Sequence, residues 1–372
     1  MKGVAETVKN LALVGCGDVA FRTYILGVLA IAGKGTVTAT FDPVAERAER
    51  AAAMFPNATA YTSYEALLAH PGLDGVVNLT PAPFHRDTTS QALDAGLHVF
   101  SEKPIAATVE DGRALIAQAE RLGKLLLVAP AVMATGRFRW LKQLFAEGPL
   151  GRPHLATGQM ANMGPAGWRA YTGDPAVFYS KDVGPMLDTA VYVLHAITGL
   201  IGPAKRVQAF GGVAIPERKV LIERLAGRTI AVGANDVMMI HLDFGENRFA
   251  QVLSSFAVPN SHNPALEVHG TEGSISIALP AWYDAWGPVD VYRRDDSLLG
   301  LDGWVHNVAP PNRPEGRTEH LIGAGPAHFV ACLAGEEQPI LTAEHALHVL
   351  EIILKATRSA DEGCAIELET GF

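Results

Sequence analysis

A lysine in the first half of the chain and a carboxylate–phenol pair in the second half are the residues best suited to acid–base chemistry. Lys103 lies just after a short apolar strand predicted at 98–100. Asp188 and Tyr192 are four residues apart in 185–198, a segment that is otherwise almost entirely apolar. An amine, a carboxylate and a phenol that converge on a hydroxyl group can remove or return its proton. These three residues are therefore the candidates for proton transfer.

The segment 185–198 is predicted to be a buried helix, because apolar side chains cover nearly all of it. Its polar exceptions include Asp188, Tyr192 and His195 at i, i+4 and i+7, which share one helix face. A buried carboxylate without a partner costs roughly several kcal/mol or loses its charge. The polar stripe must therefore face a polar partner, water or a cleft. A structural network that holds the helix explains it about as well as an active site does.

The elements before Lys103 predict a dinucleotide-binding fold. An apolar strand at 11–14 runs into the sequence Gly15-Cys-Gly17-Asp-Val-Ala20, and a helix is predicted over 19–32. Glycines at this spacing permit a tight turn and let the backbone approach a pyrophosphate, and the small third residue lets the helix pack on the strand. The helix N-terminus then directs free N–H groups at the phosphates. The cofactor-binding residues of this turn would be Gly15, Gly17, Asp18 and Val19.

A second strand, predicted at 36–41, ends at Asp42. An acidic residue in that place accepts hydrogen bonds from the ribose diol of the adenosine and would repel a 2′-phosphate. NAD is therefore favoured over NADP as the cofactor. Arg47, one turn into the next helix, is a further cofactor candidate, although a solvated helix face explains it more readily than a phosphate clamp does.

Strands and helices continue to alternate as far as residue 129, which predicts a parallel sheet covered on both faces. Ligands bind such sheets at the carboxyl ends of the strands, so the loops after the strands are the informative ones. Helices are predicted over 45–54, 84–95 and 109–122, and strands over 75–79, 97–100 and 125–129. The loops that follow these strands hold Thr80, Pro81, His85, Glu102, Lys103 and residues 130–133. From its position near a helix start, His85 is either a ligand contact or an exposed capping residue.

The order of these motifs resembles the glucose-fructose oxidoreductase and inositol dehydrogenase (Gfo/Idh/MocA) family. The motifs are a GxGxxA turn, an acid closing the second strand, T-P-x-x-x-H at 80–85 and E-K-P at 102–104. In that family the N-terminal half is a Rossmann domain that binds NAD(P), and the E-K-P lysine lies at the nicotinamide and the substrate. The resemblance implies that Glu102 is near the nicotinamide ribose and that Lys103 assists proton transfer.

The resemblance extends to the predicted helix at 185–198. Members carry a G-G-x-L-x-D-x-G-x-H-like motif there, whose Asp and His reach the cleft beside the E-K-P lysine. This chain matches in Gly184 and Asp188, but it has Tyr192 where many members have His, Val183 where Gly is usual and His195 where a second Asp is frequent. A tyrosine there resembles the glucose-fructose oxidoreductase and dihydrodiol/xylose dehydrogenase branch, which puts inositol in doubt as the substrate.

A Trp-Arg pair in the second half gives further candidates. Many family members place such a pair near the cofactor and the substrate, although a surface loop with a packed tryptophan explains it nearly as well. The pair is Trp168 and Arg169, and both are candidates for cofactor binding. Tyr179, Lys181, Asp182 and His320 are weaker candidates for the same pocket. The substrate-binding candidates are therefore Lys103, Trp168, Tyr179, Asp188, Tyr192 and His195.

The turn-rich sequence at 147–153 breaks the alternating pattern and places a domain boundary near residue 150. Residues 1–150 are predicted to form the Rossmann domain, and 151–372 an α+β domain that binds substrate, with its C-terminal helix free to pack back on the first domain. Strand-like segments there have few helices between them, which predicts a mainly antiparallel open sheet. They lie at 154–161, 206–213, 237–244, 248–256 and 274–278. A partner subunit is expected to cover the open face, giving a homo-oligomer, either a dimer or a tetramer.

Composition limits the function classes. The chain has 372 residues, 48% of them hydrophobic and 19% charged, as expected for a soluble cytoplasmic protein. A net charge of −9 without a basic run argues against nucleic acid. No apolar run approaches the roughly 20 residues of a membrane span. The three cysteines have no metal spacing, and Cys16 is expected to fill tight backbone space. His345 and His348 are expected on a solvated helix face, so no metal site is predicted.

Together the residues and the resemblance predict an oxidoreductase that uses NAD(P), preferably NAD, on a sugar, polyol or glycoside. Hydride would pass between a secondary alcohol and nicotinamide C4. Either Tyr192 is the base, with Lys103 lowering its pKa and Asp188 orienting the pair, or a neutral Lys103 is the base itself. A non-catalytic NAD-binding regulator is one alternative. Another is an enzyme with tightly bound NAD whose transient oxidation drives isomerisation or glycoside cleavage.

Overall fold

The computed structural model describes residues 8–146, 148–181, 183–294, 303–313 and 319–372, which form two compact units. The first contains the chain up to Thr135 and again from 319 to Leu347, and the second contains the remainder. This division differs from the expected boundary at residue 150. Helix α6 (Gly136–Ala146) packs on α7 (Val191–Ile201) and so belongs to the second unit, whereas α8 (Ala324–Leu333) packs within the first.

The first unit is built on a six-stranded parallel sheet in the order β3-β2-β1-β4-β5-β6. This is the strand order of a doubly wound nucleotide-binding fold, and it confirms the predicted Rossmann domain. The strands are β1 (Lys9–Val14), β2 (Gly35–Phe41), β3 (Thr59–Tyr61), β4 (Gly75–Asn78), β5 (His98–Ser101) and β6 (Leu126–Val128). The sequence did not predict β3 or the short α3 (Tyr64–Leu68), since neither contains a long apolar run.

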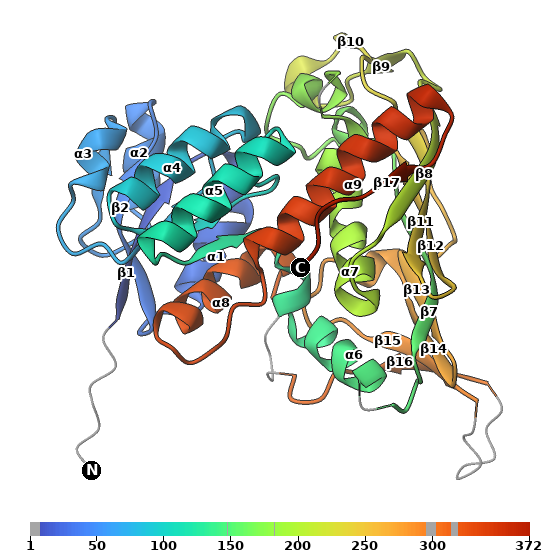
Figure 1. Cartoon of the computed structure of the whole chain (residues 1–372). Coiled ribbons are helices and arrows are strands. Elements are labelled where there is room, and N and C mark those ends of the chain that lie inside the picture. The colour runs from blue at the N-terminus through green and yellow to red at the C-terminus, as the bar shows by residue number, and fades with distance from the viewer. Residues whose placement is uncertain (1–7, 147, 182, 295–302, 314–318) are drawn as a thin grey trace, which may run out of the picture. The chain divides into compact units, whose positions relative to one another are not determined.

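Helices α1 (Ile25–Leu29), α2 (Ala45–Ala52), α4 (His85–Asp94) and α5 (Val109–Leu122) connect these strands (Figure 1). Helix α8 packs against α1, although some three hundred residues separate them in the sequence. The Phe329 ring of α8 lies 6.1 Å from the Phe100 ring of β5. A side chain at Gly75 would meet Phe329, because its Cβ would lie 2.8 Å from the ring. The C-terminal segment therefore completes the core of the first unit.

The second unit is built on a nine-stranded sheet in the order β16-β15-β14-β13-β7-β12-β11-β8-β17. Every neighbouring pair is antiparallel except β7 and β12, so the predicted mainly antiparallel sheet is confirmed. The strands are β7 (Pro153–Ala161), β8 (Arg206–Gly212), β11 (Val237–Gly245), β12 (Arg248–Ser255), β13 (Leu266–Gly270), β14 (Gly273–Ile277), β15 (Val289–Arg293), β16 (Trp304–Val308) and β17 (Ile366–Glu367). A separate hairpin joins β9 (Glu217–Lys219) to β10 (Thr229–Ala231).

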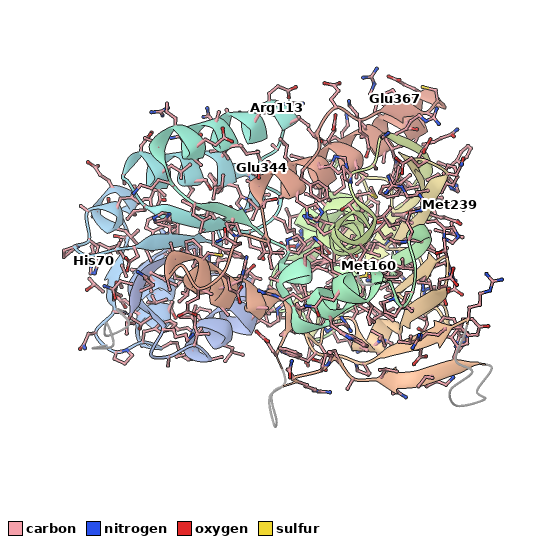
Figure 2. The ribbon with its side chains drawn as sticks, turned by 60° about the horizontal axis from the view of Figure 1, so that its bottom comes forward. His70, Arg113, Met160, Met239, Glu344 and Glu367 are labelled. Atoms are coloured by element: carbon pink, nitrogen blue, oxygen red, sulfur yellow. The ribbon has the colours of Figure 1, made fainter. Side chains whose placement is uncertain are left out.

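One face of this sheet is covered by α6, α7 and the C-terminal part of α9 (Ala343–Glu362), as Figure 1 shows. Gly158 of β7 lets α7 approach, because its Cβ would lie 2.6 Å from Val193 Cγ2. On the opposite face, strand register places Phe210, Met239 and Leu253 in one row across β8, β11 and β12. Phe210 is 67% exposed and Met239, labelled in Figure 2, is 44% exposed. No described helix covers this row.

The C-terminal tail is held by a buried carboxylate on α9. Glu351 accepts hydrogen bonds from the backbone N–H groups of Glu369 (3.0 Å) and Thr370 (2.9 Å), and Lys355 Nζ lies 2.7 Å away. Burial alone would raise the pKa of Glu351, but these donors lower it to about 2. Nearby, burial lowers the pKa of His348 to about 4. The Glu351 carboxylate therefore stabilises the fold at neutral pH and loses that contribution in acid, whereas His348 is neutral at neutral pH and its protonation in acid favours unfolding.

Glu351→Gln is expected to lower the free energy of unfolding at neutral pH by on the order of 2 kcal/mol. A carboxylate with a depressed pKa stabilises the fold above its ordinary pKa of 4.5 and loses that effect as the pH falls towards 2. The difference in unfolding free energy between variant and wild type, measured by chemical denaturation, should therefore shrink as the pH is lowered below about 4.5. Glu362→Gln, which breaks an exposed pair with Arg358, should cost less than about 1 kcal/mol. Equal losses of unfolding free energy in both variants would contradict the proposed role of Glu351 in holding the C-terminal tail.

Across the residues that the structure describes, no helix has the length and apolar character needed to cross a bilayer.

Candidate active site

The glycine turn after β1 fits the close approach of a phosphate group. Gly15 has φ +88°, and a Cβ there would lie 2.7 Å from the backbone carbonyl of Leu79. The turn therefore needs glycine both for its backbone angle and for its contact with the loop after β4. At Gly17, in contrast, no described atom lies within 4 Å of the Cβ position. Residues 18–29 are helical from there on, so the N-terminus of a helix follows the open turn, as in sites that bind phosphate.

Asp42 holds this turn from the end of β2. Its Oδ2 accepts a hydrogen bond from the Cys16 N–H (3.0 Å), and its Oδ1 accepts one from the Val44 N–H (2.9 Å). Each carboxylate oxygen retains a lone pair for a further donor, such as a ribose hydroxyl. Burial, together with the Asp42 charge, raises the pKa of Cys16 to about 12, so this thiol is unreactive and fills tight backbone space as predicted. Arg47 is exposed on the first turn of α2.

His85 connects the loops that follow β4 and β5. The ring is 1% exposed, and its Nε2 lies 2.6 Å from the Thr80 carbonyl oxygen. Its Nδ1 lies 2.7 Å from the Pro104 carbonyl oxygen. Burial lowers the pKa of His85, while the two carbonyls and Glu102 act to raise it. His85 is therefore not an exposed cap, and both its nitrogens face backbone oxygens. Thr80 is half-buried and Pro81 is exposed.

The E-K-P sequence directly follows β5, and the Lys103–Pro104 peptide is cis. Glu102 is buried, and its Oε1 accepts a hydrogen bond from the Tyr24 hydroxyl at 2.6 Å. Its Oε2 accepts one from the Lys103 backbone N–H at 2.8 Å. The lysine side chain is half-buried. Sequence reasoning missed Tyr24, because a tyrosine inside an apolar helix is typical of packing.

In the second unit, Asp188 lies in a π-helical turn, Met186–Ala190, that precedes α7. The turn changes the angular spacing of side chains, so the ideal i, i+4 relation between Asp188 and Tyr192 does not apply unaltered. Tyr192 is buried, and its ring packs edge-on against Tyr283, with centroids 5.9 Å apart. Tyr283 was not predicted, because its loop has no recognisable motif. His195 is buried and its Nδ1 lies 2.7 Å from the Val191 carbonyl oxygen of its own helix.

The remaining candidates are Tyr179, Trp168, Arg169 and Lys181 of the second unit and His320 of the first. Tyr179 is buried, and its hydroxyl oxygen accepts a hydrogen bond from the Ala166 N–H at 3.1 Å. Burial first, and then the charges of Asp188 and Asp236, raise the pKa of Tyr179. Trp168 is exposed and its ring centroid is 5.7 Å from that of Tyr171. Arg169 and Lys181 are also exposed, Asp182 lies outside the described residues, and His320 caps the turn before α8.

Comparison with known protein families gives a match for each half of the chain. Residues 9–129 match the family described as "Oxidoreductase family, NAD-binding Rossmann fold". Residues 138–276 match the "GFO/IDH/MocA C-terminal domain". The chain belongs to the Gfo/Idh/MocA oxidoreductase family. The predicted family and the prediction of an NAD(P)-dependent oxidoreductase are confirmed.

Relatives of this Gfo/Idh/MocA chain match along nearly its whole length. It is 30% identical over 365 residues to D-glucoside 3-dehydrogenase of Escherichia coli (strain K12), covering 96% of this chain and 97% of the relative. It is 28% identical over 364 residues to 1,5-anhydro-D-fructose reductase of Ensifer adhaerens, covering 97% and 98%. Levoglucosan dehydrogenase, solved with NADH and levoglucosan, has the same fold, with a TM-score of 0.82 at 21% identity and coverage of 97% and 100%.

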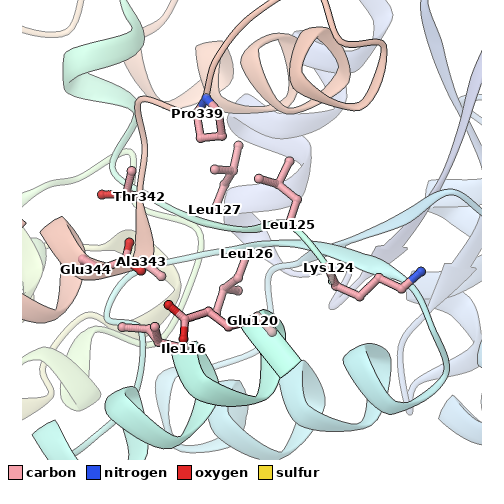
Figure 3. Close-up of a pocket in the computed structure, with 11 residues that line it drawn as sticks. Ile116, Glu120, Lys124, Leu125, Leu126, Leu127, Pro339, Thr342, Ala343 and Glu344 are labelled. Carbon is pink, nitrogen blue, oxygen red and sulfur yellow. The ribbon is translucent and has the colours of Figure 1, made fainter. Parts of the chain in front are cut away.

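A surface cavity of this family member lies apart from the residues described above. It has a volume of about 200 Å³ and lies beside the edge strand β6, between α5 and the start of α9 (Figure 3). Its polar lining comes from Glu120, Lys124, Thr342 and Glu344, and none of the candidate site residues lines it. The cavity is therefore not the candidate active site.

Two histidines of α9 differ from their expected place on a solvated helix face, because both are buried. His348 Nε2 accepts a hydrogen bond from the Ala204 N–H at 3.0 Å, and its Nδ1 lies 2.9 Å from Thr370 Oγ1. These bonds fix the end of α7 and the C-terminal tail. Within the described ranges, no group of three His, Cys, Asp or Glu side chains is arranged to hold a metal ion.

Proposed function

We propose that this protein transfers hydride between NAD(P) and a secondary alcohol of a sugar or glycoside, with Lys103, Asp188 and Tyr192 at the reacting hydroxyl. The observation that carries the proposal is the register of the parallel sheet. The last residues of β1, β2, β4 and β5 are direct partners: Val14 with Phe41 and Asn78, and Asn78 with Ser101. The glycine turn, Asp42, the Thr80 loop and Lys103 therefore all begin at one edge, where such folds bind ligands.

The names of the relatives support a carbohydrate substrate. A D-glucoside 3-dehydrogenase and a 1,5-anhydro-D-fructose reductase each align with almost the entire chain, including the second unit. We therefore propose a sugar, anhydrosugar or glycoside, in preference to an inositol, as the substrate. Tyr192 at the position where many family members have histidine favours the same choice.

NAD(P)⁺, when bound, accepts hydride at nicotinamide C4. The chain must supply a base within about 3 Å of the substrate hydroxyl, because its proton leaves as hydride departs from the carbon. In one assignment the Tyr192 phenolate accepts the proton, the positive charge of Lys103 stabilises that phenolate, and Asp188 orients the pair. In the other assignment Lys103 is neutral and accepts the proton, and Tyr192 binds the hydroxyl. Glu102 would contact the nicotinamide ribose, with Trp168 and Arg169 near the same end of the cofactor.

We propose NAD as the preferred cofactor because Asp42 occupies the end of β2. Its buried carboxylate, already fixed by two N–H groups, would repel a 2′-phosphate. Curated relatives include enzymes named for either coenzyme, so the preference is specific to the residues of each chain.

A panel of sugars, anhydrosugars, glycosides and inositols, each with NAD and with NADP, tests the function. We expect steady formation of reduced coenzyme with at least one cyclic sugar or glycoside, and at least about tenfold greater kcat/KM with NAD. Product without net NADH would instead indicate tightly bound NAD and transient oxidation. NAD binding without turnover of any compound would indicate a regulator and contradict the proposed reaction.

We further propose that a second copy of the chain covers the uncovered face of the nine-stranded sheet. The row Phe210, Met239 and Leu253 is apolar and continuous across three strands, and Phe210 and Met239 are exposed, as expected for a subunit contact. Met239→Glu is therefore expected to reduce the molecular mass in analytical ultracentrifugation to that of a monomer. Leu26→Glu, which alters an exposed apolar residue of the first unit, should leave the mass unchanged. A monomeric wild-type protein would contradict the contact.

A further inference from the structure

Two buried side chains hold the backbone on either side of Lys103. On the N-terminal side, the Tyr24 hydroxyl donates to Glu102 Oε1 at 2.6 Å. On the C-terminal side, the His85 ring approaches the Pro104 carbonyl oxygen at 2.7 Å. Both side chains are 1% exposed, and they come from different elements of the first unit. The flanks of the lysine are therefore fixed by residues that do not themselves face solvent.

The contact through Tyr24 connects Lys103 to the helix that follows the glycine turn. Tyr24 ends a π-helical turn, Ala20–Tyr24, and its ring lies 6.0 Å from the Phe100 ring in the core. Glu102 uses its two oxygens for two different donors, the Tyr24 hydroxyl and the Lys103 backbone N–H. Hydrogen bonds to a carboxylate are stronger than those between neutral groups. Tyr24 therefore fixes the direction in which the chain enters Lys103.

The contact through His85 connects the same lysine to the loop after β4. The imidazole stands between the carbonyl oxygens of Thr80 and Pro104, at 2.6 and 2.7 Å. The lowered pKa of His85 favours the neutral ring, whose single N–H donates to one of these two oxygens, and loss of the ring would remove that hydrogen bond. The charged groups that face the ring are Glu102, which favours its protonated form, and Lys103, which opposes it. His85 therefore fixes the direction in which the chain leaves Lys103.

We propose that Tyr24 and His85 are positioning residues for Lys103, acting through Glu102 and Pro104 respectively. The proposal rests on the function proposed above and adds a connection between the cofactor-binding turn and Lys103. The helix that starts at the phosphate-binding turn and the lysine that meets the substrate hydroxyl are joined by a single hydrogen-bonded connection. Displacing the lysine by as little as about 1 Å can slow an enzymatic step by up to about 100-fold.

The variants Tyr24→Phe and His85→Gln test the proposal. The first keeps the aromatic ring in the core and removes only the hydroxyl, and the second retains one hydrogen-bond donor. Tyr64→Phe is the matched control, since the Tyr64 hydroxyl donates to the Thr88 carbonyl at 2.8 Å in the same unit and not to Glu102 or Pro104. Circular dichroism and chemical denaturation of all three variants establish that they fold.

The first readout does not require turnover. The full-length proteins are acetylated with limiting acetic anhydride, and the extent of reaction at Lys103 relative to Lys124 is measured by mass spectrometry. We expect both test variants to change this ratio and Tyr64→Phe to leave it at the wild-type value. A ratio in Tyr24→Phe and His85→Gln equal to that of the control would overturn the proposal, whether or not the protein oxidises a sugar.

The second readout uses a substrate from the panel. We expect kcat to fall about 10- to 100-fold in Tyr24→Phe, with the Kd for NAD within about twofold of wild type. The deuterium isotope effect on kcat should rise, because hydride transfer becomes the slow step. A loss of NAD affinity with unchanged kcat would show a structural role only and would overturn the proposal. If the wild type oxidises no compound while the acetylation ratios differ as expected, the proposed function fails but the positioning of Lys103 stands.

Discussion

Lys103→Met is expected to slow hydride transfer by about 10²- to 10⁴-fold while the Kd for NAD stays within about threefold of wild type. Methionine fills similar space but carries no charge and no proton, so it neither stabilises a phenolate nor acts as a base. The backbone contacts that hold position 103, from Glu102 and through Pro104, do not depend on its side chain. Formation of NADH after rapid mixing at saturating NAD measures the effect.

Tyr192→Phe separates the two assignments of the base. If Tyr192 accepts the proton, Tyr192→Phe should slow hydride transfer as much as Lys103→Met does. If Lys103 accepts it, Tyr192→Phe should cost only about tenfold and should raise KM, because the phenol then only binds the hydroxyl. Lys124→Met, in the first unit beside the cavity of Figure 3, is the control and should retain the wild-type rate. Near wild-type rates in both Lys103→Met and Tyr192→Phe would refute this site.

Asp236→Asn is expected to lower the free energy of unfolding by about 3–5 kcal/mol. Asp236 is 1% exposed and Arg218 is 4% exposed, and Arg218 Nη2 donates to Asp236 Oδ2 at 2.5 Å. The same carboxylate accepts the N–H groups of Ala214 (2.6 Å) and Ile215 (3.1 Å), which fix the chain as it leaves β8. The substitution leaves the guanidinium buried without its counter-charge. Chemical denaturation at neutral pH measures the loss.

Asp174→Asn is the matched control for this buried pair. Asp174 lies 2.7 Å from Arg228 Nη1, but both side chains are exposed, so the loss should be below about 1 kcal/mol. Replacing Arg218 and Asp236 together with Leu should recover much of the stability, since it removes both buried charges. A loss in Asp236→Asn no larger than in Asp174→Asn would show that the buried pair contributes little.

The N-terminal fold could be predicted because its parallel strands are buried on both faces and appear as apolar runs separated by helices. The helix over Val109–Leu122 has the predicted bounds, with Thr108 capping its start and Gly123 its end at φ 61°. The π-helical turns at Ala20–Tyr24 and Met186–Ala190 could not be predicted, since they depend on tertiary contacts and have no distinct side-chain pattern. The division between the units was likewise set by packing, not by the turn-rich sequence at 147–153.

The candidate site was predictable only where a local motif carries it. The glycine turn, Asp42 and the E-K-P lysine lie at strand ends, and each is recognisable from its own neighbours. Tyr24 is 78 residues from Glu102 in the sequence, so no local pattern encodes their hydrogen bond. The same limit applies to Tyr192 and Tyr283, and to the buried histidines of α9. The sequence could propose His85 as a functional residue, but only the fold shows that it connects two loops.

The proposed site can be tested by the distance between Lys103 and Tyr192 in a crystal structure with NAD and an oxidised or reduced sugar bound. We expect Lys103 Nζ to lie within about 6 Å of the Tyr192 hydroxyl or the Asp188 carboxylate, close enough for each charge to affect the other group's proton. A distance greater than about 6 Å from Lys103 Nζ to both groups in that closed complex would contradict the proposed site.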